Sequence, residues 1–249
     1  MCVAALAWHA HPRWRLVAIG NRDEYHARPA AALARWDASS GIVAGRDMTG
    51  GGTWLGVSEA ARFALITNRR GFGDPNPARR SRGELVSAML AGAAPPADLD
   101  AYNPFSLLAI GAGKLEFLTN RPEALRTTLG HGVYGLSNGA LDEPWPKTLA
   151  LKAALTDWLS ANSSDPAALY AILASENRPA IGLPPREPSD IAVEPADTPP
   201  FIRSTLYGTR CSTVVAVDNH GAGRIVERGF DAAGRPVGDT ALDFRWPAA

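Results

Sequence analysis

Two apolar runs separated by a short turn open the chain, and their pairing constrains the fold more than any other feature. The first run covers residues 2–8 (CVAALAW) and the second covers residues 15–20 (RLVAIG), with Pro12 in the turn between them. Runs of this length on either side of a turn predict two antiparallel strands. The sequence therefore predicts that the chain begins with a hairpin.

The register of this hairpin decides which residues meet the start of the chain. Centred on Pro12, the hairpin places Cys2 directly opposite Arg22, with Cβ atoms roughly 4.5–5.5 Å apart. A slip of one residue would bring Asn21 or Asp23 opposite Cys2 instead. In each of these registers, a cluster of polar and charged residues meets the first strand.

Cys2 carries a thiol and, if Met1 is trimmed, also the α-amine of the mature chain. Trimming is normal when the second residue is as small as cysteine. The α-amine has an ordinary pKa of about 7.7–8.0 and can act as a base for a neighbouring nucleophile. A guanidinium such as that of Arg22 should lower the thiol pKa, and a carboxylate such as Asp23 can orient the amine. The alternative is a small buried cysteine beside a solvated strand end.

Six short motifs are spread from the start of the chain to residue 210. They are NRDE at 21–24, GGGTWLG at 50–56, TNR at 67–69, RG at 82–83, GLSN at 135–138 and YGTR at 207–210. Together they resemble the NRDE family, also called the transport and Golgi organisation family. More distantly, the same landmarks resemble the cysteine-type N-terminal-nucleophile hydrolases, which include choloylglycine hydrolases and acid ceramidase-like amidases.

The resemblance implies an amidohydrolase that cleaves a non-peptide C–N bond through an acyl-Cys2 intermediate. It also implies a four-layer αββα sandwich of two antiparallel sheets. The implied catalytic residues are Cys2 as nucleophile and base, Arg22 and Asp23 as its orienting pair, Asn68 and Asn138 as oxyanion donors, and Arg210 as support for the thiolate or the substrate carbonyl. Some NRDE members are discussed as handlers of haem or lipid, so a binding or trafficking protein for haem or fatty-acyl ligands is the alternative function.

Several of these residues also have a purely structural interpretation. Asn68 and Asn138 each follow an apolar strand, where asparagine commonly forms a turn. Arg210 stands just before a buried-looking strand and could be a core arginine paired with Asp23 or Glu24.

An acyl pocket needs apolar walls as well as catalytic groups. Trp54, Trp145 and Tyr207 are candidates for these walls, although each is also a typical core residue. Asn21 joins them as a candidate for substrate binding. The two histidines of the first turn have no third ligand nearby, so we expect no metal and no cofactor. The expected partner is a small acyl-amide substrate or a hydrophobic ligand.

Composition excludes some classes of partner. The 249 residues carry 25 basic and 25 acidic side chains, so the chain lacks the basic excess of a nucleic-acid-binding protein. Two cysteines form no disulfide framework, and a working thiol fits a reducing compartment. No signal peptide and no apolar run of about 20 residues is present, so we expect a cytoplasmic protein without a membrane span.

Predicted strands come in runs, and predicted helices are grouped between them. This order favours an α+β fold with antiparallel sheets over the strict alternation of a parallel α/β fold. A proline-rich stretch over residues 179–203 is expected to be a long loop rather than a linker. We therefore expect one domain over residues 1–249.

Overall fold

The computed structural model describes residues 2–37, 40–177 and 198–247, and its strands form two antiparallel sheets. The six-stranded sheet has the spatial order β10 (Gly132–Leu136), β1 (Cys2–Trp8), β2 (Trp14–Tyr25), β11 (Tyr207–Asp218), β12 (Ala222–Phe230) and β13 (Pro236–Arg245). The seven-stranded sheet has the order β3 (Ala30–Arg35), β4 (Ile42–Asp47), β5 (Leu55–Ser58), β6 (Arg62–Asn68), β7 (Phe105–Gly111), β8 (Lys114–Thr119) and β9 (Leu125–Leu129). The predicted α+β class is thereby confirmed.

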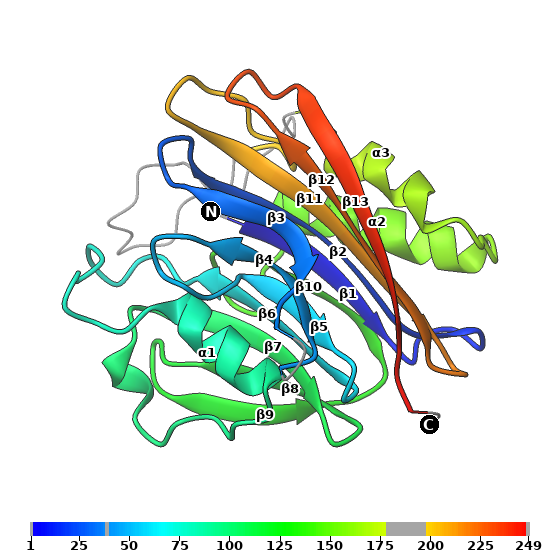
Figure 1. The fold of residues 1–249 in the computed structure, drawn as a ribbon, viewed down its shortest axis with the longest axis horizontal. Helices are drawn as coiled ribbons and strands as arrows, with labels where there is room; N and C mark the ends of the chain where they lie inside the picture. The colour runs from blue at the N-terminus through cyan, green and yellow to red at the C-terminus, as the bar shows by residue number, and fades with distance from the viewer. Residues whose placement is uncertain (1, 38–39, 178–197, 248–249) are drawn as a thin grey trace.

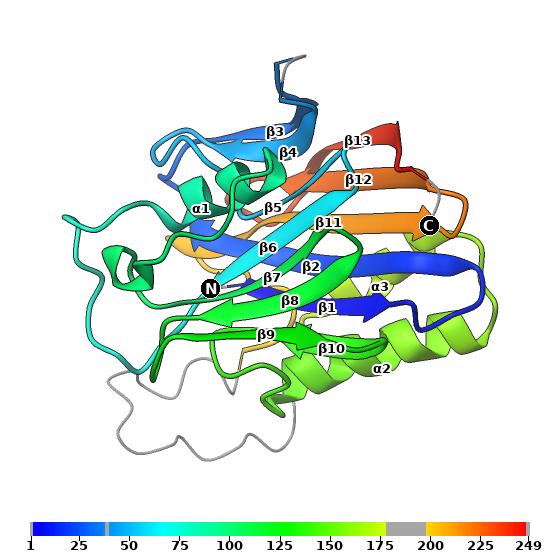
Figure 2. The ribbon, with the colours of Figure 1, turned by 90° about the horizontal axis from the view of Figure 1, so that it is seen from below.

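Helices cover the outer faces of the two sheets. Helix α1 (Arg82–Leu90) packs on the seven-stranded sheet, whereas α2 (Pro146–Ser160) and α3 (Tyr170–Leu173) pack on the six-stranded sheet. Figures 1 and 2 show these helices on opposite sides of the stacked sheets. Two short 3-10 helices, η1 (Leu99–Ala101) and η2 (Pro166–Leu169), lie in the connections. The layers therefore follow the predicted order of helix, sheet, sheet and helix.

The hairpin of β1 and β2 has the predicted register, with Cys2 opposite Arg22. Alternation along these strands divides their side chains between two cores. Leu6 packs between the sheets, whereas Val3 packs against the helices. By the same alternation, Cys2 and Arg22 lie on the side between the sheets, and Asn21 lies on the helix side. A slip of one residue would move every side chain of the slipped strand to the opposite face of the sheet.

The C-terminal end of the described chain ties the two sheets together. Trp246 follows β13, is buried, and donates its indole N–H to the carbonyl oxygen of Ser58 in β5 at 2.8 Å. The guanidinium of Arg15 lies 5.4 Å from the Trp246 ring and 5.9 Å from the Trp8 ring. These contacts close the core between the sheets at the end away from Cys2.

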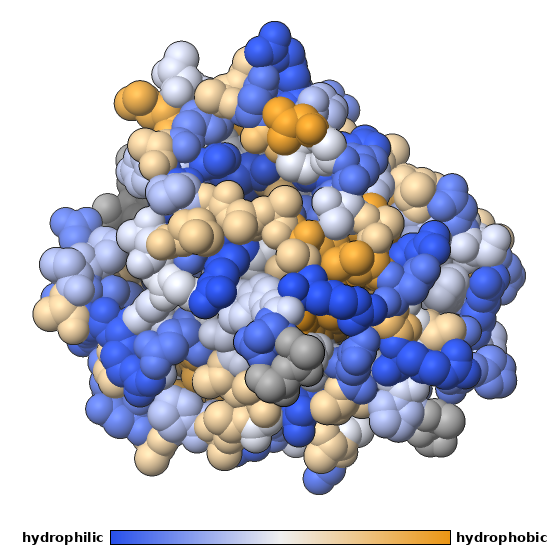
Figure 3. All heavy atoms as spheres, viewed as in Figure 1, coloured by the Kyte–Doolittle hydropathy of each residue, from blue (hydrophilic) through white to orange (hydrophobic). Residues whose placement is uncertain are grey.

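The surface seen in Figure 3 mixes hydrophilic and hydrophobic side chains. No helix in the described part of the chain is both long enough and apolar enough to cross a bilayer. The loop predicted over residues 179–203 lies mostly outside the described residues.

Candidate active site

A cavity of about 630 Å³ opens where β1 begins. Its walls come from β1, β2, β11, β12 and β13 of one sheet, from β3, β4 and β6 of the other, and from the start of α1. The predicted site residues that line it are Cys2, Arg22, Asp23, Trp54, Asn68 and Arg210. The fold thus brings together segments that are far apart in the sequence.

Cys2, Arg22 and Cys211 form a row across three neighbouring strands. Arg22 is opposite Cys2 on one side and opposite Cys211 on the other. Directly opposed residues point to the same face of a sheet, so both thiols face the cavity. Two strand spacings separate the cysteines by roughly 9.5 Å, beyond the reach of a disulfide, and both are free thiols.

A β-bulge in β11 makes this row possible. Thr209 pairs with Asp23, but the next pair in the ladder joins Cys211 to Arg22, so Arg210 is the extra residue. Without the bulge, Arg210 would stand directly opposite Arg22, and two guanidiniums would repel each other across the strands. Bulges commonly redirect a side chain in this way.

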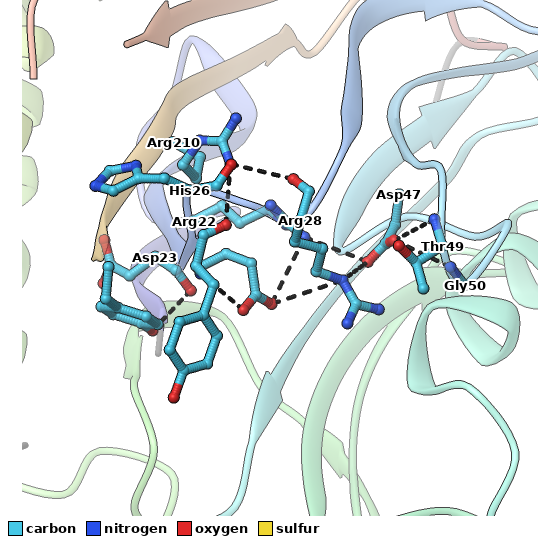
Figure 4. A network of polar contacts seen from close by, with 11 residues as sticks. Arg22, Asp23, His26, Arg28, Asp47, Thr49, Gly50 and Arg210 are labelled. Atoms are coloured by element: carbon cyan, nitrogen blue, oxygen red, sulfur yellow. Dashed lines mark hydrogen bonds and ion pairs between the residues drawn. The ribbon is translucent and has the colours of Figure 1, made fainter. Parts of the chain in front are cut away.

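Arg210 reaches the turn that follows β2. Its Nη1 donates to the carbonyl oxygens of Tyr25, His26 and Arg28 at 3.0 to 3.1 Å, as Figure 4 shows in part. A guanidinium that satisfies three carbonyls fixes the path of that turn. The predicted support of the thiolate by Arg210 stays a prediction.

The Cys2 thiol is held in its neutral form. Burial raises its pKa above the ordinary value, and this effect outweighs Arg22 and the backbone N–H of Asp23, both of which lower it. The sequence predicted that Arg22 would lower the thiol pKa. That contribution has the expected sign, but the net direction is the opposite because desolvation disfavours the thiolate more strongly. A base must therefore take the proton when the sulfur attacks.

Asp23 is fully enclosed at the end of β2. Its Oδ1 accepts a hydrogen bond of 2.7 Å from the hydroxyl of Thr209. Burial raises the pKa of Asp23 to about 6, although the nearby Lys147 ammonium and the Thr209 hydroxyl act to lower it. A carboxyl group with this pKa changes its protonation state close to neutral pH, which suits a group that orients an amine.

Carboxylates from both sheets hold Arg22 in place. Asp47, at the end of β4, accepts hydrogen bonds on one oxygen from Arg28 at 2.7 Å and from Arg22 at 3.3 Å. Glu24 lies 3.7 Å from Arg22 and 3.9 Å from Arg28. Figure 4 shows Arg22 and Arg28 beside Asp47. Burial acts to raise the pKa of Asp47, but hydrogen bonds from Arg28 and from the backbone of residues 49–50 lower it overall. Asp47 therefore remains a carboxylate that holds Arg22 in place.

The two predicted oxyanion residues are in direct contact. Asn68 lines the cavity, and the amide of the buried Asn138 donates to the Asn68 carbonyl oxygen at 2.9 Å. The neighbouring Ser137 donates to the carbonyl oxygen of Cys2 at 2.8 Å. The structure thus places Asn68 on the cavity wall and Asn138 behind Asn68. The residue before Asn138 in the sequence contacts Cys2.

Asn21 points away from the cavity. Its Nδ2 donates to the carbonyl oxygens of Leu173 and Pro200, both at 2.8 Å, and its Oδ1 accepts from the Ser212 hydroxyl at 2.6 Å. These bonds hold the sheet against α3 and the segment before β11. The structure does not bring Asn21 to the other predicted residues.

The three predicted aromatic residues are dispersed. Trp54 lines the cavity. Tyr207 lies behind it, where its hydroxyl donates to the Asp23 carbonyl oxygen at 2.8 Å. Trp145 precedes α2, and its ring centre is 5.9 Å from the ammonium of Lys147. Neither Tyr207 nor Trp145 is among the residues that line the cavity.

Glu227 is a cavity residue that the sequence analysis missed. It accepts a hydrogen bond from the backbone N–H of Leu33 at 2.8 Å and interacts with the thiol of Cys211. Burial raises the pKa of both Glu227 and Cys211. Strand alternation could have identified Glu227, because it shares the inward face of its strand with Gly223 and Ile225. A charged residue is unexpected on that face.

Lys147 is a second residue that was missed. It is almost completely buried, and its ammonium donates to the Thr198 hydroxyl at 2.9 Å. It is close enough to Asp23 to lower the pKa of that carboxyl group. No sequence signal pointed to it, since a lysine in the first turn of a helix is normally exposed.

Comparison with known proteins decides the family. The family model described as Transport and Golgi organisation 2 matches residues 1–232. The chain belongs to this family. Among transport and Golgi organisation 2 homologues, the protein of Bos taurus is 32% identical and that of Homo sapiens 29% identical, each over 92% of both chains. The resemblance drawn from the six motifs is confirmed.

A solved structure is also similar to this chain. It is that of a Caenorhabditis elegans N-acylethanolamine-hydrolyzing acid amidase ortholog, with a TM-score of 0.48 and 13% sequence identity. The match covers 86% of this chain and 92% of the amidase. At that TM-score the likeness adds nothing to the fold described above.

Proposed function

We propose that this protein is an amidohydrolase in which Cys2 cleaves a non-peptide acyl-amide C–N bond. The observation that carries the proposal is the common cavity of Cys2, Arg22, Asp23 and Asn68, in which Arg22 is directly opposite the thiol. A nucleophile on a rigid strand, with a cation beside it and amide groups on the facing wall, suits acyl transfer. The free thiol also suits a cytoplasmic location.

The proposed reaction begins once Met1 is removed. The α-amine of Cys2 takes the thiol proton, and the sulfur forms a bond to the substrate carbonyl carbon. Asn68 stabilises the resulting oxyanion. Asn138 holds Asn68 in place by donating to its carbonyl oxygen. The ammonium then returns its proton to the leaving amine as the C–N bond breaks. Water attacks the thioester, releases the carboxylic acid and restores the thiol.

Asp23 orients the α-amine in this proposal, and Arg22 favours the thiolate that forms during attack. Two electrostatic contributions support these roles: the charge of the amino terminus lowers the pKa of the Asp23 carboxyl group, and the Arg22 guanidinium lowers the pKa of the Cys2 thiol. Arg22 itself is held by Asp47. The site therefore needs no histidine as base.

A second candidate function is the binding of a fatty-acyl ligand or haem without turnover. The apolar part of the cavity wall favours it, since Trp54, Ile66, Phe230 and Val237 would contact an acyl chain. This function predicts stoichiometric ligand uptake and no product. A haem titration without an absorbance shift, and no lipid in the purified protein, would count against it.

The test compares the two cysteines of the cavity. Turnover of a panel of N-acyl nitroanilides is measured for the unaltered protein, Cys2→Ala and Cys211→Ser, with circular dichroism as a check on folding. We expect Cys2→Ala to lose about 10³-fold or more in kcat/KM, and Cys211→Ser to stay within about threefold. Full turnover by a folded Cys2→Ala variant would refute the proposal.

A further inference from the structure

Arginine dominates the charged part of the cavity wall. Seven arginines line the cavity, against four acidic residues. The whole chain, in contrast, has equal numbers of basic and acidic residues. Positive charge is therefore concentrated at this site, and a concave cationic surface attracts anions.

Most of these arginines already have partners. Arg28 and Arg80 form ion pairs with carboxylates, and Arg210 satisfies three backbone carbonyls. The guanidinium of Arg46 lies 4.6 Å from the Trp36 ring centre. Carboxylates compensate the charges of Arg28 and Arg80, and neutral partners hold Arg46 and Arg210 in the walls of the cavity. Arg79 likewise donates to the Tyr102 carbonyl oxygen, at 2.9 Å.

Arg82 is of interest because it interacts electrostatically with Cys2, as Arg22 does. It is the first residue of α1 and lies in the cavity wall, where its Nη1 donates to the Pro104 carbonyl oxygen at 3.0 Å. Within the described residues it forms no ion pair, yet it is close enough to Cys2 and Glu24 to interact electrostatically with both. A cation beside the proposed nucleophile therefore lacks an anionic partner within ion-pair distance.

Arg22 adds a second unused donor at the same site. The residue is only 8% exposed, and its buried Nη1 has no hydrogen-bond partner among the described residues. An unpaired buried donor costs free energy. A ligand oxygen on the Cys2 side of the cavity would remove that cost.

The backbone around Arg82 is tightly packed. A Cβ added to Gly52 would lie 2.1 Å from the carbonyl carbon of Gly83, and one added to Gly50 would lie 2.8 Å from the Ser81 hydroxyl. The N–H of Thr53 also donates to the Gly83 carbonyl oxygen at 3.2 Å. The triple glycine thus lets the chain lie directly against the start of α1, which fixes where Arg82 enters the cavity.

We propose that the ligand of this cavity carries an anionic oxygen group, a carboxylate or a phosphate, that Arg82 binds beside Cys2. The Nη1 of Arg22 donates a further hydrogen bond to the same ligand. A guanidinium matches two oxygens of either group through paired N–H donors. The inference rests on the proposed function only in taking this cavity as the substrate site.

The test measures binding in a protein that does not turn over. Isothermal titration of Cys2→Ala uses N-dodecanoylglycine, dodecyl phosphate and the neutral N-dodecanoylglycinamide. All three carry a twelve-carbon chain, so differences in affinity report on the head group. We expect at least one anionic ligand to bind about tenfold or more tightly than the amide. Adding Arg82→Gln should weaken that binding by about tenfold to a hundredfold and leave the amide unchanged. The matched control is Arg46→Gln, expected to cost no more than about threefold.

The outcomes separate this inference from the proposed function. Preference for the carboxylate or for the phosphate identifies the source of the anion. Equal binding of all three ligands, no binding of any, or insensitivity to Arg82→Gln would overturn the inference. Hydrolysis of the glycinamide by the unaltered protein, independent of Arg82, would then leave the amidohydrolase standing. Binding that depends on Arg82 with no turnover of any amide would support the inference and refute the hydrolase.

Discussion

At the scale of single residues, Asp23 couples the stability of the fold to pH. Its pKa is about 6 in the folded protein and near 3.8 in an unfolded chain, so the folded state holds the extra proton between these values. Stability must therefore fall as pH rises through this window, by on the order of 3 kcal/mol. We expect Asp23→Asn to have a higher Tm than the unaltered protein at pH 8, with the difference vanishing towards pH 4. Parallel Tm curves would contradict this.

The same carboxyl group should shape the activity. In the proposed reaction Asp23 works as a carboxylate, so kcat/KM should rise as pH increases through about 6. Asp23→Asn should lower kcat by about a hundredfold and remove that limb of the pH profile. The profile is measured with the nitroanilide that the unaltered protein cleaves fastest. A variant that kept the limb would assign it to another group.

Single residues also show where sequence reasoning succeeds and fails. The opposition of Cys2 and Arg22 was predictable, because strand alternation and a proline turn leave few registers. The net pKa of the Cys2 thiol was not, because desolvation depends on how much protein surrounds the sulfur. The prediction that Asn21 binds substrate overlooked this alternation, which places its side chain on the helix side of the sheet.

At the scale of elements, the turn of Gly50, Gly51 and Gly52 determines how α1 docks. Gly52→Ala forces a Cβ into the backbone of Gly83, which no change of side-chain rotamer can relieve. We expect a loss of about 1–3 kcal/mol in the free energy of unfolding. The matched control is Gly111→Ala, where a Cβ meets nothing within 4 Å. Urea unfolding midpoints compare the two variants, and equal midpoints would refute the docking role.

The bulge in β11 marks the limit of prediction at this scale. The hairpin of β7 and β8 and the strands ending at Asn68 and near Asn138 follow the apolar pattern of the sequence. Nothing in the pattern around Arg210 indicated an extra residue in the ladder. The bulge arises from the pairing of β2 with β11, which are far apart in the sequence. Local secondary-structure propensity therefore does not indicate it.

At the scale of the whole molecule, Trp246 holds the sheets together at the end away from the cavity. Trp246→Ala removes a buried ring from the core and the hydrogen bond to Ser58, and should cost about 3–5 kcal/mol. Trp246→Phe keeps most of the packing and should cost clearly less. Thermal unfolding measures both. Equal, small losses would show that the sheets do not depend on this contact.

The overall architecture was predictable because runs of strands with grouped helices leave few arrangements that bury both faces of a sheet. The cavity was only partly predictable. Its predicted site residues follow from motifs, but Arg28 enters it from the turn after β2, and Asp47 and Glu227 enter it from strands of the two sheets. Their roles depend on how the sheets stack, which no local pattern specifies.

Reactivity of the two cavity thiols tests the central proposal most directly. The intact mass of the purified protein is measured before and after treatment with a β-lactone, and the adduct is mapped by peptide sequencing. We predict that Met1 is absent and that a single acyl adduct lies on Cys2, with none on Cys211, although both thiols line the same cavity. Retention of Met1, or equal labelling of Cys2 and Cys211, would contradict an activated nucleophile at Cys2.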